Sequence, residues 1–297
     1  MDTMVNILLV HGRSRPLFGP VEMKQQWVVA LRSGFDAAGI EAPFTDEDVR
    51  LPWYGGNLKH LVGGVARAEA ERVSLRGDLP VDEREFVRDV VAAVGESFAF
   101  TPEQLEAVTG SADTGSGSED WGRVRTVLAA VDRYVPGMSG ATVAFVAREC
   151  FGYLTDARLR QMIDDGVAQA APTGGPVVVL GHSLGAVIAY HVLRAHPAAE
   201  SWDVPLLLTM GAPLAWQPVI QALGRLETRR MPTPVRSWVN ARDARDAVAI
   251  GGLVGGLLPA GDVVEEPGVV NPDDGRHAIE YYLADPVVAR HIARVAG

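Results

Sequence analysis

The pentapeptide Gly181-His182-Ser183-Leu184-Gly185 constrains the fold of this chain more than any other feature of its sequence. It follows an apolar run rich in β-branched residues, 177–180, and precedes a run of small apolar residues, 186–189, with which a helix can begin. A G-x-S-x-G sequence between a strand and a helix is typical of a nucleophile elbow, a sharp turn that pushes a serine hydroxyl out of the sheet. The two glycines permit this turn and let the helix cross close to the strand. We therefore predict that Ser183 is a nucleophile.

A second, similar pentapeptide lacks these surroundings. Gly137-Met138-Ser139-Gly140-Ala141 follows Tyr134-Val135-Pro136, where a proline and the lack of an apolar run argue against a strand. We interpret Ser139 as a loop or helix-start residue.

The composition argues against several kinds of partner and location. The net charge of −10 disfavours nucleic acid and anionic membranes as partners, because affinity for phosphate groups comes mainly from clustered Lys and Arg. The one cysteine, Cys150, rules out an internal disulfide, and we expect a buried thiol. No apolar stretch approaches the roughly 18 residues that span a bilayer, and the first four residues lack the basic segment of a secretory signal. We expect a cytoplasmic protein without a transmembrane segment.

Apolar runs alternate with helical periodicities along the chain. Short strands are expected at residues 5–10, 177–180, 204–210 and 236–240, and helices at 25–38, from the elbow to about 196, and at 278–295. This alternation predicts an α/β fold with a mostly parallel central sheet flanked by helices. Since such sheets often form units of ~250 residues or more, we expect a single domain over residues 1–297.

Residues 58–171 form a largely helical interval between the first strand and the elbow. Two interpretations stay open: an inserted cap or lid over a site, or a run of surface helices. The first predicts that residues of this interval wall part of an active-site pocket. The Pro/Gly-rich residues 51–57 are expected to form a loop that lies over the site.

A serine hydroxyl is a weak nucleophile at neutral pH, so it needs a base and a group that orients that base. Of the seven histidines, His277 alone follows a turn late in the chain, from which its ring can reach over the sheet edge toward Ser183. We interpret His277 as the base. The acid is expected between these two residues in sequence, after a strand.

Two carboxylates compete for the role of the acid. Asp246 is preferred because the apolar residues after it, Ala247-Val248, can tuck its loop into the core. Asp243 is the alternative. The carboxylate that is not the acid is expected to cap the loop or to pair with Arg242 or Arg245.

Acyl transfer also needs hydrogen-bond donors for the oxyanion of the tetrahedral intermediate. The backbone N–H of Leu184, directly after the serine at the start of a helix, is one expected donor. The second is expected after the first strand, where Gly12 allows a close approach and Arg13 offers its N–H. A simple tight turn at His11-Gly12 is the alternative.

Together these segments resemble the α/β-hydrolase superfamily, in its lipase-like and serine-esterase-like branch. The resemblance rests on Val10-His11-Gly12, on the elbow pentapeptide, and on Met210-Gly211-Ala212-Pro213-Leu214, which is similar to the Gly-Ser-Pro turn of lipase-like members. Asp246 and His277 fall where such members keep their acid and base. The resemblance covers residues 5–10 and 177 to the end, and says little about the helical interval.

The resemblance implies an α/β-hydrolase fold with a helical insertion or cap, and hydrolysis of an ester, thioester or amide through an acyl-enzyme on Ser183. Neither metal-ligand spacing nor a phosphate-binding glycine motif appears, so we expect no cofactor and no metal. Two other functions stay open: a catalytically silent binding protein of the same fold, since fold alone does not guarantee chemistry, and an acyltransferase or thioesterase using the same triad.

The sequence departs from the family pattern at three places. Alanine replaces the usual serine at Ala212 and the proline often found after the acid at Ala247, and Arg13-Ser14-Arg15 is unusually basic. These arginines either bind an anionic substrate group or are solvated surface charges. An apolar, lipid-like acyl substrate would suit the glycine-rich residues 251–258 and the aromatic residues near the site loops; the latter are Trp53, Tyr54 and Trp216.

Overall fold

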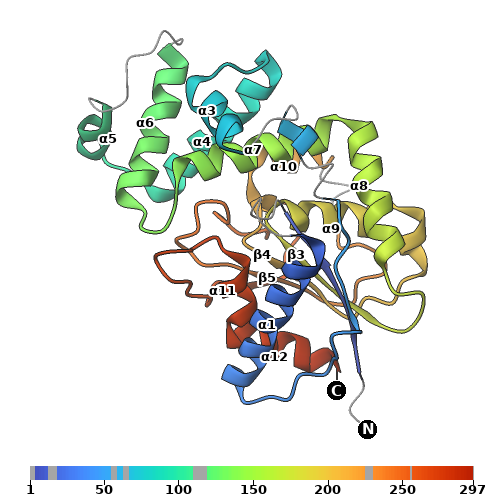
Figure 1. The fold of residues 1–297 in the computed structure, drawn as a ribbon. Coiled ribbons are helices and arrows are strands. Elements are labelled where there is room, and N and C mark those ends of the chain that lie inside the picture. Colours follow the sequence, from blue (N-terminus) through green and yellow to red (C-terminus); the bar gives the residue numbers. More distant parts are fainter. Residues whose placement is uncertain are drawn as a thin grey trace.

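The computed structural model describes residues 4–12, 19–54, 59–62, 67–109, 119–224, 230–254 and 256–296. At its centre is a six-stranded, all-parallel sheet with the order β2-β1-β3-β4-β5-β6 (Figure 1). The strands are β1 (Asn6–Val10), β2 (Val49–Arg50), β3 (Val177–His182), β4 (Leu207–Met210), β5 (Trp238–Ala241) and β6 (Val264–Glu266). The predicted α/β class with a parallel central sheet is confirmed.

Side chains of the central strands point alternately to the two faces of the sheet, and both faces are covered. Every residue of β3 is buried. Val177 and Val179 belong to one hydrophobic cluster, whereas Val178 and Leu180 belong to another on the opposite face. A strand that is buried on both faces needs apolar residues at most successive positions, which is why β3 begins with the uninterrupted apolar run 177–180.

Helices from both ends of the chain cover one face of the sheet, and helices from its middle cover the other. On the first face α1 (Pro20–Ala38) packs against α11 (Ile279–Ala284) and α12 (Pro286–Ala296). The second face carries α8 (Ala157–Ala170), α9 (Leu184–Ala195) and α10 (Gln217–Ala222). The single helix predicted at 278–295 is divided at Asp285-Pro286, because a residue before proline disfavours the helical conformation and proline suits the first turn of a new helix.

Between β2 and β3 the chain forms the predicted helical insertion. Figure 1 shows α3 to α6 gathered beyond one end of the sheet. The helices are η1 (Lys59–Val62), α3 (Arg67–Arg76), α4 (Val81–Phe98), α5 (Pro102–Thr109), α6 (Glu119–Tyr134) and α7 (Gly140–Thr155). A buried ion pair, Arg148 Nε to Glu83 Oε1 at 2.5 Å, ties α7 to α4.

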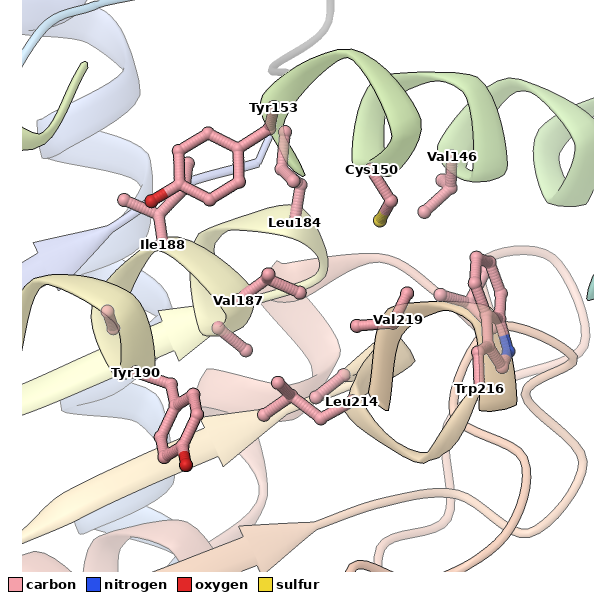
Figure 2. Packing of buried hydrophobic residues seen from close by; sticks show 14 of the residues in the cluster. Val146, Cys150, Tyr153, Leu184, Val187, Ile188, Tyr190, Leu214, Trp216 and Val219 are labelled. Atoms are coloured by element: carbon pink, nitrogen blue, oxygen red, sulfur yellow. The ribbon is translucent and has the colours of Figure 1, made fainter. Parts of the chain in front are cut away.

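The helix α7 joins the insertion to the rest of the molecule. Figure 2 shows Val146, Cys150 and Tyr153 of α7 across from Leu184, Val187 and Ile188 of α9. Helix α7 is buried on most of its surface, so it lacks the amphipathic period by which a helix is recognised in a sequence. Cys150 is fully buried, as expected, and burial raises the pKa of its thiol well above the ordinary range.

Candidate active site

The turn from β3 into α9 holds Ser183 in an unusual backbone conformation. Its φ of 55° and ψ of −132° are rare for a residue with a side chain, and such strain persists only where the surrounding structure enforces it. The two glycines of the pentapeptide provide the necessary space. A Cβ at Gly185 would overlap the carbonyl oxygen of Val10, and a Cβ at Gly181 would lie 2.8 Å from the Cα of Ala186.

His277 brings its imidazole ring between Ser183 and Asp246. Its Nε2 lies 3.0 Å from Ser183 Oγ, and its Nδ1 lies 2.7 Å from Asp246 Oδ2. Since a carboxylate only accepts hydrogen bonds, Nδ1–H donates to Asp246, which leaves Nε2 to accept the serine proton. The structure thus joins the three residues in the order hydroxyl, imidazole and carboxylate.

The carboxylate of Asp246 is fully buried and held at both oxygens. Its Oδ1 accepts a hydrogen bond from the backbone N–H of Val248 at 2.9 Å, and its Oδ2 accepts a second one from the Tyr282 hydroxyl at 2.9 Å. Ala247 and Val248 are buried in the core, where the sequence led us to expect them.

Asp243 binds arginines and lies apart from the imidazole. Its carboxylate accepts two hydrogen bonds from the Arg245 side chain, at 3.0 and 2.9 Å, and one from the buried Arg276 at 3.3 Å. Burial alone would raise the pKa of Asp243, but the hydrogen bonds from Arg245 and from the N–H of Asn271 lower it below its ordinary value. The carboxylate not bound to His277 therefore pairs with Arg245, one of the two predicted partners.

A second histidine lies behind the first. His182 Nε2–H donates to the backbone carbonyl of His277 at 3.1 Å, and the two ring centroids are 4.9 Å apart. Burial lowers the pKa of His182 well below its ordinary value, so this ring is neutral. Gly211, with φ of 55°, leaves room for it: a Cβ there would lie 3.2 Å from both His182 Nε2 and Asp246 Oδ2. This glycine begins the Gly211-Ala212-Pro213 turn.

The loop after β1 approaches the elbow closely. A Cβ at Gly12 would lie 3.2 Å from the Ser183 Cβ and 3.3 Å from the backbone nitrogen of Leu184, the first residue of α9. This places Gly12 beside one predicted oxyanion donor. The other predicted donor, Arg13, and the rest of Arg13-Ser14-Arg15 lie outside the described residues.

His11 supports this loop from the inside. Its ring is buried and stacks on Tyr54 at a centroid distance of 4.1 Å. Its Nε2 lies 3.0 Å from the carbonyl oxygen of Pro52. Burial lowers the pKa of His11 to about 4, although the nearby carbonyls of Gly12 and Pro52 act in the opposite direction. Tyr54 is therefore a packing residue here, and its hydroxyl donates to the His11 carbonyl at 2.5 Å.

A pocket of about 490 Å³ opens beside Ser183 and His277. Part of its wall comes from the helical insertion, as the cap interpretation predicts, and part from α1 and the segment around His277. The apolar lining residues include Met23, Trp27, Met138, Phe145, Val146 and Ile279; the polar ones include Gln26, Ser139, Thr142, Glu149, Asp274 and Glu280.

Several residues considered for the acyl group lie elsewhere. Trp216, at the start of α10, is buried beside α7 in the larger hydrophobic cluster (Figure 2), and the leucines of the glycine-rich segment, Leu253, Leu257 and Leu258, are buried in the same cluster. Trp53 is 44% exposed, and its ring centroid lies 5.7 Å from that of His11.

Two residues that contact the site, Tyr282 and Arg276, were not predicted from the sequence. A tyrosine inside a helix and an arginine beside a loop histidine carry no local signal, and only the contacts of Tyr282 with Asp246 and of Arg276 with Asp243 connect them to the site. Among the described residues, no group of three or more His, Cys, Asp or Glu side chains is arranged to hold a metal ion.

Comparison with known proteins adds no family assignment. No protein-family model matches the chain, and neither the curated proteins nor the solved structures contain a significant match. The fold and site define an α/β protein with an all-parallel six-stranded sheet, a helical insertion and a Ser-His-Asp constellation at the carboxyl ends of the strands. In the part of the chain described, none of the helices is both long and apolar enough to cross a bilayer.

Proposed function

We propose that this chain is a serine hydrolase of the α/β-hydrolase fold that cleaves an ester through an acyl-enzyme on Ser183. The observation that carries the proposal is the continuous hydrogen-bonded chain from Ser183 Oγ through His277 to Asp246, with the serine held in a strained elbow. A hydroxyl, an imidazole and a buried carboxylate in this order are the groups that nucleophilic acyl transfer requires.

In the proposed reaction, Ser183 Oγ attacks the ester carbonyl while His277 Nε2 takes its proton. The N–H groups of Leu184 and Arg13 stabilise the oxyanion that forms. His277 then gives its proton to the departing alcohol, which leaves an acyl group on the serine. A water molecule, activated by the same imidazole, releases the acid and regenerates the enzyme. Asp246 keeps the imidazole oriented and stabilises its positive charge throughout.

The pocket supports a small-molecule ester with an apolar acyl group. Its volume of about 490 Å³ is that of a small-molecule site, and Met23 and Trp27 of α1 with Phe145 and Val146 of α7 make part of its otherwise mixed lining apolar. Thioester hydrolysis or transfer of the acyl group to an alcohol or amine would use the same residues, and the choice among these reactions depends on the acceptor that reaches the acyl-enzyme.

A fluorophosphonate probe tests the proposed nucleophile. The wild-type protein should be labelled, and Ser183→Ala should not. Ser139→Ala is the matched control, because it removes another serine hydroxyl that lines the pocket, and it should still be labelled. Labelling of Ser183→Ala would reject Ser183 as the nucleophile, and an unlabelled wild-type protein would favour the silent binding protein.

A panel of p-nitrophenyl esters of increasing acyl length then tests the substrate class. We expect turnover to be lost in Ser183→Ala, by at least about 10⁴-fold. We also expect KM to fall as the acyl chain lengthens, until the chain fills the pocket. A KM that does not depend on chain length would argue against an apolar acyl site.

A further inference from the structure

The hydroxyl of Tyr282 connects the two competing aspartates. Tyr282 lies on α11 and is fully buried. Its oxygen accepts a hydrogen bond from the backbone N–H of Asp243 at 3.1 Å, and its proton goes to Asp246 Oδ2 at 2.9 Å. An amide N–H only donates and a carboxylate only accepts, so the direction of both hydrogen bonds is fixed. Burial raises the pKa of Tyr282 well above its ordinary value, which keeps this proton in place.

The Tyr282 proton and the His277 ring share one oxygen atom. Asp246 Oδ2 accepts from the Tyr282 hydroxyl at 2.9 Å and from His277 Nδ1 at 2.7 Å. With Val248 N–H on Oδ1, three donors fix the rotation of the carboxylate. A second donor on Oδ2 also withdraws part of the negative charge that would otherwise stabilise a protonated imidazole.

Tyr282 also links two segments of the site that are distant in sequence: its own helix, α11, and the turn that contains Asp243 and Asp246. Asp243 and Asp246 close one turn, in which the N–H of Asp246 donates to the carbonyl of Asp243 at 3.0 Å. Tyr282 belongs to the helix that directly follows the His277 loop. One buried side chain therefore sets the distance between the turn that carries the carboxylate and the segment that carries the imidazole.

We propose that Tyr282 is a positioning residue of the triad, which holds Asp246 against His277 and limits the charge that the carboxylate offers to the imidazole. This inference rests on the proposed hydrolase function. It predicts that Tyr282→Phe, which removes one oxygen atom and keeps the ring, lowers kcat/KM about 10-fold, since hydrogen bonds to charged groups are among the strong ones. It further predicts that the acid limb of the pH profile moves to higher pH by about half a unit, because Oδ2 loses a competing donor.

The experiment compares wild type, Tyr282→Phe and the control Tyr190→Phe. Tyr190 is also fully buried, but its hydroxyl donates to the backbone carbonyl of Arg230 at 3.3 Å, away from the triad. Turnover of a p-nitrophenyl ester is measured from pH 4 to 9 and divided by the number of active sites titrated with the fluorophosphonate probe. This division removes any loss of folded protein from the comparison.

The proposal is supported if Tyr282→Phe alone is slower per active site and its acid limb moves upward. Unchanged turnover and an unmoved acid limb would overturn it while leaving the hydrolase function intact. Slower turnover with an unmoved acid limb, or equal effects in both variants, would show a purely structural role and overturn it as well. A wild-type protein that neither reacts with the probe nor hydrolyses any ester would instead reject the proposed function itself.

Discussion

Gly137, in the turn between α6 and α7, lies directly against the backbone carbonyl of Asp273, in the segment that leads to His277. A Cβ at Gly137 would overlap that carbonyl oxygen, and its φ of 79° favours glycine. The buried Arg276 reinforces the contact, since its Nε donates to the carbonyl of Pro136 at 2.7 Å. The wall of the pocket and the segment carrying the imidazole are thus packed on each other without space between them.

Gly137→Ala should therefore disturb both stability and substrate binding. The strained backbone and the steric overlap together should lower the free energy of unfolding by about 2–3 kcal/mol. Relief of the overlap requires the turn and the His277 segment to separate, which should also raise KM. Urea unfolding and ester kinetics measure the two effects.

Gly166→Ala is the control for this substitution. Gly166 lies inside α8, and a Cβ there would have no neighbour within 4 Å. Alanine is the better helix former, so this variant should gain about 0.5–1 kcal/mol and keep its KM. Equal effects of the two substitutions would contradict the proposed contact.

Asp246→Asn should mainly lower kcat, whereas Asp243→Asn should mainly lower stability. Asparagine at Asp246 presents the imidazole with the wrong hydrogen-bond partner, so kcat should fall about 10³- to 10⁴-fold in a folded protein. Asparagine at Asp243 leaves the guanidinium of Arg276, which is 1% exposed, with a weaker set of partners. Breaking a buried ion pair typically costs about 3–5 kcal/mol; because Arg276 keeps Asp273 as a partner, we expect about 3 kcal/mol of lost stability.

Urea unfolding and kcat per titrated site, measured on both aspartate variants, separate these outcomes. If Asp243→Asn lost its turnover while remaining as stable as wild type, Asp243 would be the acid and our interpretation of the site would be wrong.

Stability should fall as the pH is lowered from 6.5 to about 4, because of His11. The folded protein keeps this ring neutral down to about pH 4, whereas the unfolded chain takes up a proton near the ordinary value of 6.5. The unfolded state binds more protons in this window, so acidification favours unfolding, by about 3 kcal/mol in total. Buried His182 acts in the same direction.

Urea unfolding at several pH values checks this prediction. His11→Gln does not titrate and should show a shallower pH dependence than wild type. His60→Gln, at an exposed position, should keep the slope of the wild-type protein. A slope that His11→Gln leaves unchanged would rule out His11 as its source.

Ser183→Gly should be more stable than Ser183→Ala by about 1 kcal/mol. Both variants lose the hydroxyl and its hydrogen bond to His277, but only glycine adopts a φ of 55° and ψ of −132° without strain. The greater freedom of glycine in the unfolded chain offsets part of the gain. Denaturant titration of the two variants gives the difference directly. If Ser183→Gly were less stable than Ser183→Ala by about 0.4–1 kcal/mol, the full cost of glycine's freedom in the unfolded chain, the elbow would store no strain.

The sequence predicted those parts of the fold that local chemistry specifies. The strands of the sheet centre are buried on both faces and therefore need mostly apolar residues, so β1, β3, β4 and β5 are visible as apolar or mostly apolar stretches. The short strands β2 and β6 lie at the two edges of the sheet and carry no such run. They are strands because they pair with β1 and β5, and this pairing leaves no local pattern in the sequence. Helix α7 lies in the interval that the sequence predicts to be largely helical, and Ser139, interpreted as a loop or helix-start residue, is its N-cap. Its own bounds carry no clear signal, since burial on most sides removes its amphipathic period.

By itself the sequence determined the elbow, because a serine at positive φ between a strand and a helix requires glycines at fixed positions around it. It also predicted His277 as the base of the proposed triad and left two candidates, Asp243 and Asp246, for its acid. Only the tertiary structure decided which carboxylate meets the imidazole. Asp243 and Asp246 belong to one turn, and the neighbouring Arg245 binds the first. Their remaining partners are distant in sequence: Arg276 also binds Asp243, and Tyr282 and His277 bind Asp246. Contacts of this kind are made by the packing of whole elements, which no local pattern records.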